Sequence, residues 1–295
     1  MPVPAAAELA LESSMLARAA RILYSFTAAT PEQSMTDVVR RTGLPRSSVH
    51  RILDQLVRLK ALERSGVRYR LGLGLIELGA LAAHQNRLRE VALPFLHRLH
   101  AATGMPVHLS VLDGHEIVYL EKVGGAPDGR GPSRAGGRQP AYCTAAGKAM
   151  LAFAGEERFA EVVAAGMTAR TPFTVTAPQV LRRELAGIRE RGVALDREEN
   201  HRGVACVAAP LRDGGGRPVA AISLSGPPHR LDPRALTPRL LTTSRAVWRA
   251  LFVPSRRAPV PAPAERERRP LASGPHWSEE ALSGMVAWSK RDDWM

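Results

Sequence analysis

The chain has 295 residues, of which 45% are hydrophobic and 23% are charged. This length is enough for about two domains of roughly 150 residues each with a buried core, so a short disulfide-stabilised scaffold is excluded. The ordinary composition also argues against wholesale disorder and against a collagen-like or coiled-coil protein.

The charge balance is strongly basic: 41 Lys and Arg residues stand against 28 Asp and Glu residues, which gives a net charge of +13. Such a charge attracts polyanions, and by itself it fits DNA, RNA or anionic lipid. We expect no membrane partner, because no stretch approaches about 18 uncharged apolar residues and the N-terminus carries Glu8 and Glu12 in place of a basic signal peptide. The two cysteines, Cys143 and Cys206, have no disulfide-type spacing, which fits a reducing, cytoplasmic location.

The first part of the chain predicts three helices. Residues 14–26 carry apolar side chains at helical spacing, namely Leu16, Ala19, Ala20, Leu23 and Phe26. A short second helix over 37–42 ends at Gly43, and a third begins after Pro45. The third helix repeats apolar residues at Val49, Ile52, Leu53, Leu56 and Val57. Two helices joined by a short Gly-containing turn, the second of them amphipathic, are typical of a helix-turn-helix.

The outer face of the third helix and the segment that follows it are basic. Residues 62–71 alternate around a Ser-Gly turn, as a two-stranded wing does. Residues 36–70 contain nine Lys and Arg residues against three Asp and Glu residues, so almost half of the net positive charge lies in this segment. The outer face of the third helix consists of Arg46, Ser47, Ser48, His50, Arg51, Gln55 and Arg58. Such side chains suit phosphates and base edges in a major groove.

The remainder of the chain predicts a connector and a second domain. Two apolar-periodic helices, 73–86 and 89–103, lead to a hairpin that turns at Asp113-Gly114. The further elements are helices at 145–154, 180–191 and 234–252, strands at 204–210 and 218–225, and a Gly-rich loop at 124–140 that we interpret as a lid. The pattern indicates an α+β fold with an antiparallel sheet flanked by helices. The Pro- and Arg-rich residues from 253 onward predict a flexible tail, and the role of its Trp277, Trp288 and Trp294 stays open.

Together these features resemble the IclR family of bacterial transcriptional regulators over about residues 14–252. The motifs that carry the resemblance are RTGLPRSSVHR at 41–51, RYRLG at 68–72, TAAGK at 144–148, DREEN at 196–200 and AISLSGP at 221–227. The resemblance implies a flexible N-terminus (1–13), a winged helix-turn-helix (14–72), linker or dimerisation helices (73–103), a GAF/PAS-like antiparallel-sheet effector-binding domain (104–252) and a tail (253–295).

The resemblance also implies which residues of the winged helix contact DNA. Ser47, Ser48 and Arg51 are expected to reach bases or nearby phosphates, with Arg46 at the start of the helix and His50 on the same face. An arginine fork at position 51 can bind a guanine edge with two hydrogen bonds. Arg68 and Arg70 of the wing are expected on the DNA backbone, where they lend salt-sensitive affinity.

In the second domain, the resemblance places an effector near Ala145, Ala146, Asp196, Cys206, Ser223 and Ser225. Thr144 has the character of an N-cap, so the amides of Ala145, Ala146 and Gly147 would lie at a helix N-terminus that can hold a carboxylate. Ser223 and Ser225 share one side of a strand, whereas Asp196 is expected to accept from an effector hydroxyl or to orient a donor. Alternatively, the serines face solvent and Asp196 caps the loop through Asn200. The first interpretation suggests a hydroxylated or aromatic organic acid as effector.

Other functions are compatible with parts of the sequence. Tyr142 and Cys143 depart from the family pattern before the TAAGK stretch, so the identity of an effector does not carry over. An enzyme could use Cys143 or Cys206 with His108 or His201, although Cys206 fits better as a small packing residue. A sequence-blind, charge-driven DNA binder is a third alternative. His97 and His100 lack the further ligands of a metal site, so we expect no metal, no cofactor and no catalytic residues.

The sequence therefore predicts a ligand-responsive, non-enzymatic transcriptional regulator of a metabolic operon. Its expected partners are double-stranded DNA with a pseudo-palindromic operator and a small organic acid, and it is expected to form a homodimer or tetramer. Effector binding would change the spacing of two winged modules through residues 73–103. Repression and activation fit the sequence equally well.

Overall fold

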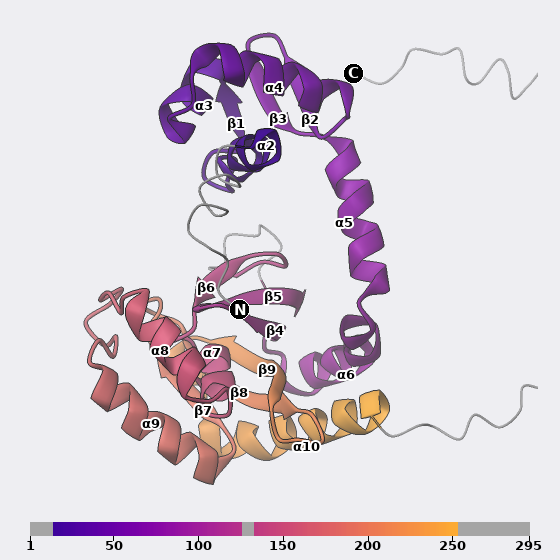
Figure 1. Ribbon diagram of the computed structural model, residues 1–295. Coiled ribbons are helices and arrows are strands. Elements are labelled where there is room, and N and C mark those ends of the chain that lie inside the picture. The colour runs from indigo at the N-terminus through magenta and orange to yellow at the C-terminus, as the bar shows by residue number, and fades with distance from the viewer. Residues whose placement is uncertain (1–13, 126–132, 253–295) are drawn as a thin grey trace, which may run out of the picture. The chain divides into compact units, whose positions relative to one another are not determined.

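A computed structural model describes residues 14–125 and 133–252 of the chain (Figure 1). The expected flexible N-terminus, the expected tail with its three tryptophans, and residues 126–132 of the expected lid lie outside the described residues. No helix within the described ranges is long and apolar enough to cross a membrane.

The first described domain is a winged helix-turn-helix. Its elements are α2 (Met15–Tyr24), β1 (Glu32–Ser34), α3 (Met35–Thr42), α4 (Arg46–Arg58), β2 (Leu62–Ser65) and β3 (Arg68–Leu71). The strands form an antiparallel sheet in the order β1-β3-β2, so the predicted wing is confirmed and gains a third strand, β1, that the sequence pattern did not indicate. The turn between α3 and α4 places Gly43 at φ +65°, a left-handed conformation that favours glycine.

Two details of this domain correct the sequence prediction. Helix α3 begins at Met35 instead of Asp37, because Ser34 caps it in a reciprocal capping box with Asp37. On α2, Leu16 is 82% exposed, whereas Ile22, outside the predicted apolar stripe, is fully buried. Ala19, Leu23 and Phe26 of the predicted stripe do pack on the core formed with α3, α4 and the wing, so only the start of the predicted stripe is wrong.

Two helices continue the chain as predicted, α5 (Leu73–Gln85) and α6 (Arg87–Thr103). Helix α5 buries none of its residues in the protomer, although it is strongly apolar: Leu73, Ile76, Leu78 and Leu81 are each more than half exposed. Pro94 lies inside α6, near its middle. Helix α6 buries Ala92, Leu96 and Leu99 in the hydrophobic core of the second domain.

The second domain is built on a six-stranded antiparallel sheet with the order β6-β5-β4-β9-β8-β7. Its strands are β4 (Val107–Asp113), β5 (Glu116–Val123), β6 (Arg138–Pro140), β7 (Ala194–Arg197), β8 (Ala205–Arg212) and β9 (Pro218–Gly226). Its further helices are α7 (Ala145–Leu151), α8 (Glu156–Ala164), α9 (Pro178–Arg191), a short 3-10 turn (Pro228–Arg230) and α10 (Pro233–Phe252). The α+β class is confirmed, while α8, β6 and β7 had not been predicted.

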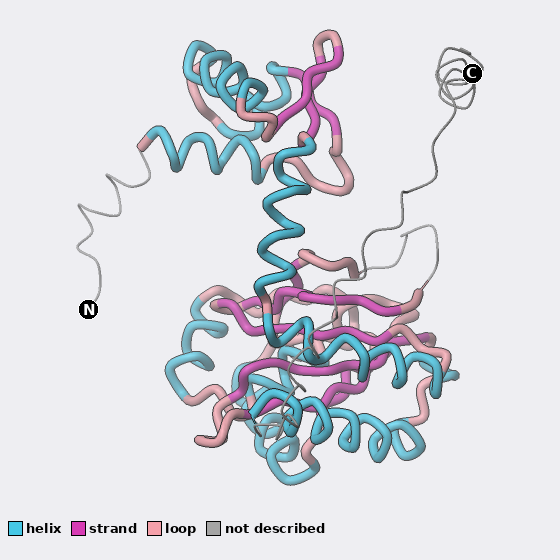
Figure 2. The backbone as a smooth tube through the Cα atoms, turned by 90° about the vertical axis from the view of Figure 1, so that its right-hand side faces the viewer, coloured by secondary structure: helices cyan, strands magenta, loops and turns pink. Residues whose placement is uncertain are grey.

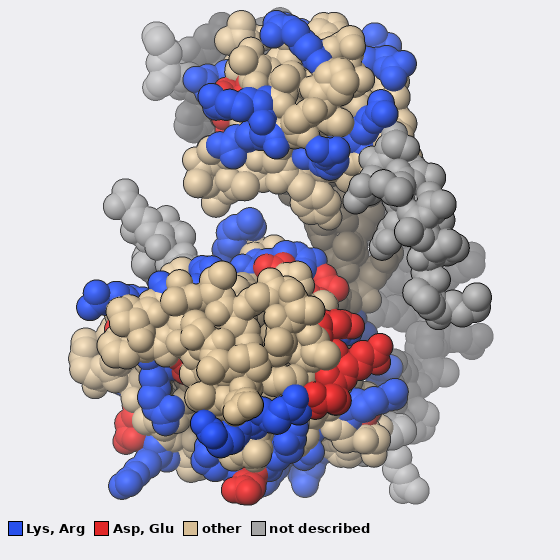
Figure 3. All heavy atoms as spheres, turned by 60° about the vertical axis from the view of Figure 1, so that its left-hand side comes forward, with Lys and Arg blue, Asp and Glu red and all other residues tan. Residues whose placement is uncertain are grey.

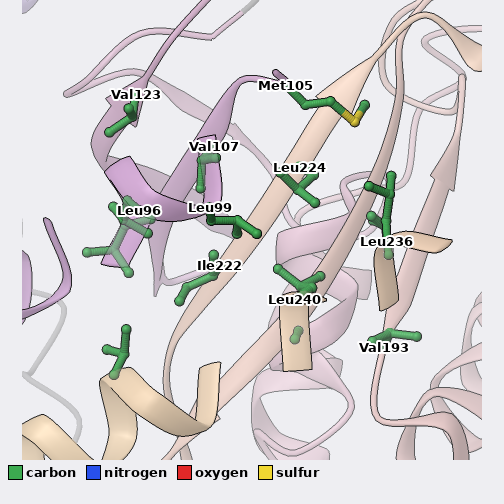
Figure 4. Packing of buried hydrophobic residues seen from close by; sticks show 14 of the residues in the cluster. Leu96, Leu99, Met105, Val107, Val123, Val193, Ile222, Leu224, Leu236 and Leu240 are labelled. Carbon is green, nitrogen blue, oxygen red and sulfur yellow. The ribbon is translucent and has the colours of Figure 1, made fainter. Parts of the chain in front are cut away.

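Helices cover both faces of this sheet, and each face has its own hydrophobic core (Figure 2). Helices α6 and α10 pack on one face, where Leu96, Leu99, Val107, Ile222 and Leu240 converge (Figure 4). Helices α7, α8 and α9 cover the other face. The strand residues beneath α7 are small, with Ala208 and Ala221 fully buried, so the helix can lie close to the sheet.

Candidate functional site

The N-terminal part of α4 presents the residues predicted to contact DNA. Arg46, Ser47, His50 and Arg51 are exposed and Ser48 is half-buried, while the opposite face of the helix is buried in the core. Arg51 has no acidic partner among the described residues, whereas Nδ1 of His50 lies 3.6 Å from Oδ2 of Asp54. Among the charged side chains visible on the winged helix domain, basic ones prevail over acidic ones (Figure 3). The arrangement gives Arg51 the freedom to extend toward a nucleic acid.

The two predicted wing arginines differ in their surroundings. Arg70 binds Glu63 across the β2–β3 pair, with a distance of 2.7 Å between Nη2 and Oε2. Arg68 is exposed on the same strand and pairs through its backbone with Ser34 of β1. Because the Arg70 guanidinium is paired with Glu63, it has fewer donors left for a phosphate. Arg68 is therefore better placed than Arg70 to contact the DNA backbone.

A cavity of about 210 Å³ opens on the sheet face that α7 covers. Six of the seven predicted effector-binding residues line it: Ala145, Ala146, Asp196, Cys206, Ser223 and Ser225. Strand register explains this convergence, because Ser225 pairs with Cys206 and Cys206 pairs with Asp196, which sets the three side by side across β9, β8 and β7. The interpretation in which both serines face solvent is therefore wrong. Their contact with an effector stays a prediction.

The seventh predicted residue, Gly147, does not line the cavity. Thr144 caps α7 as expected, and its hydroxyl accepts from the Gly147 amide at 3.2 Å, so this amide is already used. A Cβ at Gly147 would lie 2.3 Å from the carbonyl oxygen of Ala141. Glycine is needed here because the helix touches the preceding backbone.

Asp196 both lines the cavity and caps the turn that follows β7. Its Oδ1 accepts from the Glu199 amide at 2.7 Å. Burial raises the pKa of the Asp196 carboxyl to about 7, although the backbone amides of Glu199 and Asn200 act in the opposite direction. At neutral pH this group can therefore exchange a proton and offer either a donor or an acceptor.

A buried ion cluster holds this turn in place. The ammonium group of Lys148 is fully buried and donates to Oε1 and Oε2 of Glu199, at 2.6 and 2.7 Å, and to Oε1 of Glu184 at 2.7 Å. Glu198 within the turn adopts φ +62°, an unfavourable value for a residue with a side chain. The turn is held from the other side by Thr174, whose hydroxyl donates to the Glu199 carbonyl at 2.6 Å. The cavity wall is thus tied to α7, α9 and the α8–α9 connection.

Sequence reasoning missed further lining residues, among them His108, Tyr119, Lys122 and Ser133. Burial lowers the pKa of His108 to about 3, so the ring is neutral, and its Nε2 lies 2.8 Å from the hydroxyl of Ser133. His108 pairs with Ser223 on one side and with Lys122 on the other. The alternation of apolar and polar residues along β4 and β5 was visible in the sequence. The sequence did not indicate which face of the sheet holds the cavity.

The cysteines have the environment of packing residues. Burial raises the pKa of Cys143 to about 12 and that of Cys206 well above its usual value. The Cys143 thiol contacts Oδ1 of Asn200 at 3.8 Å and has no histidine partner among residues 14–125 and 133–252, and neither Cys143 nor Tyr142 lines the cavity. These surroundings weigh against a thiolate nucleophile.

The histidines on α6 differ from each other. His97 is exposed, whereas His100 is half-buried and its Nδ1 lies 2.7 Å from the Met105 carbonyl oxygen. No group of three or more possible metal ligands occurs among residues 14–125 and 133–252.

The fold and the cavity define a DNA-binding domain joined to a ligand-sensing domain. Residues 15–66 match the IclR helix-turn-helix domain, and residues 80–251 match the description "Bacterial transcriptional regulator IclR C-terminal". The chain belongs to the IclR family of bacterial transcriptional regulators and is a DNA-binding regulator with an effector-binding domain.

Named relatives support this assignment. The chain is 36% identical over 244 residues to the transcriptional regulator XynR of Escherichia coli K12, covering 81% of this chain and 97% of XynR. It is 29% identical over 235 residues to the transcriptional repressor IclR of the same organism, covering 78% and 86% of the two chains. A crystal structure of an IclR homolog from Microbacterium hydrocarbonoxydans, complexed with 4-hydroxybenzoate, is 31% identical with a TM-score of 0.73 and coverages of 81% and 99%.

Proposed function

We propose that this protein senses a small organic acid and thereby controls a metabolic operon. In this proposal residues 14–72 bind a pseudo-palindromic operator, residues 104–252 bind the acid, and residues 73–103 connect the two in a homodimer or tetramer. The protein acts by binding and carries out no catalysis. The observation that carries the proposal is the cavity beside α7, in which polar side chains from four strands converge on an otherwise apolar wall.

The size and polarity of the cavity favour a small acid. A volume of about 210 Å³ is below the roughly 300 Å³ at which sites for drug-sized ligands begin. Ser223 and Ser225 offer hydroxyl donors, and among the described residues Lys122 is the one Lys or Arg side chain that lines the cavity. The similar IclR homolog from Microbacterium hydrocarbonoxydans was crystallised with 4-hydroxybenzoate, which supports a hydroxylated aromatic acid as the effector.

The exposed apolar helix α5 favours association of two copies. Leu73, Ile76, Leu78 and Leu81 would leave a large hydrophobic surface in water if the protein were a monomer. A second copy of the same helix covers such a surface by two-fold symmetry, which also places two recognition helices for two half-sites. Light scattering of the purified protein is expected to give a dimer or a tetramer, and a monomer at micromolar concentration would contradict this part.

The proposal is tested by selecting DNA fragments of the source genome on the purified protein at near-physiological salt. Enrichment of one pseudo-palindromic site beside a metabolic operon supports a sequence-specific regulator. The acids of the pathway that this operon encodes are then the effectors to test. Broad enrichment without a motif supports the charge-driven DNA binder instead. An acid that binds the protein but changes neither operator affinity nor the geometry of the complex contradicts the coupling between the domains.

The two kinds of DNA contact are separated by Arg51→Ala and Arg68→Ala. Arg51 lies free on α4, so its loss is expected to cost about 1–3 kcal/mol of specific binding and to relax base preference at one position. Arg68→Ala is expected to weaken operator and random DNA alike and to reduce the salt dependence. Binding isotherms for operator and scrambled duplexes at two salt concentrations measure both effects. Equal losses on both duplexes for both variants would refute the assigned roles.

The titration of Asp196 gives a pH dependence for acid binding. Because burial raises the pKa of this carboxyl to about 7, it is neutral at pH 6 and largely ionised at pH 8. Repulsion between two carboxylates should then make the affinity for 4-hydroxybenzoate fall as the pH rises from 6 to 8. Asp196→Asn keeps an acceptor for the Glu199 amide and should give a flat profile in calorimetry. If the affinity of wild type and variant changed equally with pH, a group other than Asp196 would cause the pH dependence.

The same shift predicts the sign of a stability change. The pKa of Asp196 is higher in the folded protein than in the unfolded chain, so the folded state favours the protonated carboxyl. The stabilisation from this carboxyl is complete below about pH 4 and is lost as the pH rises toward 7. Asp196→Asn should therefore raise the melting temperature at pH 8, with a difference that shrinks as the pH is lowered toward 4. A variant that is less stable than wild type at pH 8 would show that the ionised carboxylate is favoured in the folded protein.

A further inference from the structure

The hydroxyl group of Tyr119 has no hydrogen-bond partner among the described residues. Tyr119 lies on β5, is 9% exposed and lines the cavity. Buried tyrosine hydroxyls nearly always find a partner, as Tyr142 does by donating to the Thr168 carbonyl at 2.6 Å. The unused donor and acceptor of Tyr119 therefore mark a position that a ligand can fill.

Several contacts fix the direction of this side chain. A β-bulge between Leu109 and Ser110 of β4 brings Ser110 opposite Tyr119, and bulges commonly redirect a side chain toward a site. The Tyr119 amide donates to the Gly137 carbonyl at 3.0 Å, and its carbonyl accepts from the Gly136 amide at 2.8 Å. The ring packs at 5.2 Å against His108. The backbone of Tyr119 is thus held in place, and the contact with His108 restricts its ring before any ligand arrives, which limits the entropy cost of binding.

The surroundings of the hydroxyl are unsuitable for an anion. Burial raises the pKa of Tyr119, and the carboxyl of Asp196 and the thiols of Cys206 and Cys143 shift it in the same direction. The phenol is therefore neutral at every physiological pH. A carboxylate placed here would be repelled by Asp196 when that carboxyl is ionised, whereas an uncharged hydroxyl could accept from Tyr119 or donate to it.

The charge of the cavity lies at a different position. Lys122, His108 and Ser223 are neighbours in one row across β5, β4 and β9. The Lys122 ammonium donates to the Ser133 carbonyl at 2.8 Å and retains two further donors. The neutral His108 ring adds no charge to this row. An acid group is best compensated beside Lys122 and Ser223, and a hydroxyl is best recognised by Tyr119.

We propose that Tyr119 is a specificity-determining residue that selects effectors bearing an uncharged hydroxyl group at the end remote from the acid group. This inference rests on the proposed sensing of an organic acid and adds the second functional group of the ligand. It makes the Tyr119 hydroxyl the group that recognises the hydroxyl of the effector.

The test uses three probes that differ by one group each: 4-hydroxybenzoate, benzoate and 4-hydroxybenzyl alcohol. Calorimetry on the full chain is expected to show that wild type prefers 4-hydroxybenzoate to benzoate by at least tenfold. Tyr119→Phe should lose about tenfold in affinity for 4-hydroxybenzoate and leave benzoate binding unchanged. Tyr142→Phe is the matched control, because it removes a buried phenol hydroxyl outside the cavity and should leave both affinities unchanged.

Stability without ligand provides a second readout. Tyr142→Phe should lower the melting temperature because it removes a made hydrogen bond, whereas Tyr119→Phe should leave it unchanged or raise it. A loss of stability in Tyr119→Phe as large as that in Tyr142→Phe would show an internal partner for Tyr119 and overturn the proposal.

The outcomes also separate this inference from the proposed function. Equal affinity of wild type for 4-hydroxybenzoate and benzoate overturns the role of Tyr119 but leaves acid sensing intact. Binding of 4-hydroxybenzyl alcohol alone, weakened in Tyr119→Phe, supports the hydroxyl site and contradicts acid sensing. Failure of wild type to bind all three probes at millimolar concentration overturns the selection of a phenolic hydroxyl.

Discussion

Replacement of Lys148 by methionine is expected to destabilise the effector domain by about 3–5 kcal/mol. The variant leaves Glu199 and Glu184 without the ammonium group that now compensates both carboxylates in the interior. Burial already raises the pKa of Glu199, so one carboxyl should take up a proton to reduce the cost. Chemical denaturation at pH 7 measures the loss, and lowering the pH to 5 should recover part of it.

Two comparisons make this result specific to the buried charge. Arg182→Met removes an ion pair with Glu156 in which the side chains are 54% and 68% exposed, and it should cost less than about 1 kcal/mol. The triple variant Lys148→Met, Glu184→Gln, Glu199→Gln removes the charges together and should be more stable than Lys148→Met alone. Equal stability of Lys148→Met and wild type would mean that water or another cation compensates these carboxylates.

Gly147→Ala is expected to be nearly as damaging, with a loss of about 3 kcal/mol and no detectable effector binding. The added methyl group would lie 2.3 Å from the carbonyl oxygen and 2.4 Å from the Cα of Ala141, and neither backbone atom can rotate away. The first turn of α7 must move to make room, and with it Ala145 and Ala146 at the cavity wall. Thermal melting and calorimetry with 4-hydroxybenzoate measure the two effects.

A second glycine in the same domain serves as the control. In Gly187→Ala on α9, the nearest atom to the new methyl group is the end of the flexible Arg191 side chain, at 2.6 Å. That side chain is exposed and can rotate, so alanine should be neutral or slightly stabilising through its better helix propensity. A similar loss in both variants would indicate that backbone contact at Ala141 is not the cause.

Strong local signals explain which parts of the fold could be predicted. Helix α4 was recognisable because Val49, Ile52, Leu53 and Leu56 repeat at helical spacing and are all buried. The wing and the β4–β5 hairpin were bounded by glycine turns, with Gly66 at φ +59° and Gly114 at φ +60°. In these elements sequence, local geometry and packing agree.

Short elements with few buried residues could not be predicted. Helix α8 buries only Phe159 and Val162, which is too few to establish a helical period. Strand β7 has four residues and β1 has three, and each exists because a longer strand pairs with it. Pairing of this kind depends on tertiary contacts and leaves little trace in the segment itself.

Sequence motifs predicted about half of the residues that line the cavity. The other lining residues reach the cavity only because of the way the chain folds. The motif residues Asp196, Ser223 and Ser225 line it, whereas His108 and Tyr119 reach it through strand order and a bulge. The role of Lys148 was hidden as well, because its partners lie 36 and 51 residues away along the chain. From the sequence alone, a lysine in a helix is expected on the surface, because the carboxylates that would compensate it in the interior are not known.

The short edge strands of the six-stranded sheet restrict how copies of this protein can meet. Its outermost strands, β6 and β7, have three and four residues, and β6 ends in Pro140, which has no amide hydrogen to donate. Such edges offer a poor template for adding a strand from another molecule, so the described part of the domain resists open-ended polymerisation through its sheet. Contacts between copies are directed to helical surfaces instead, where closed symmetric assemblies of defined size can form.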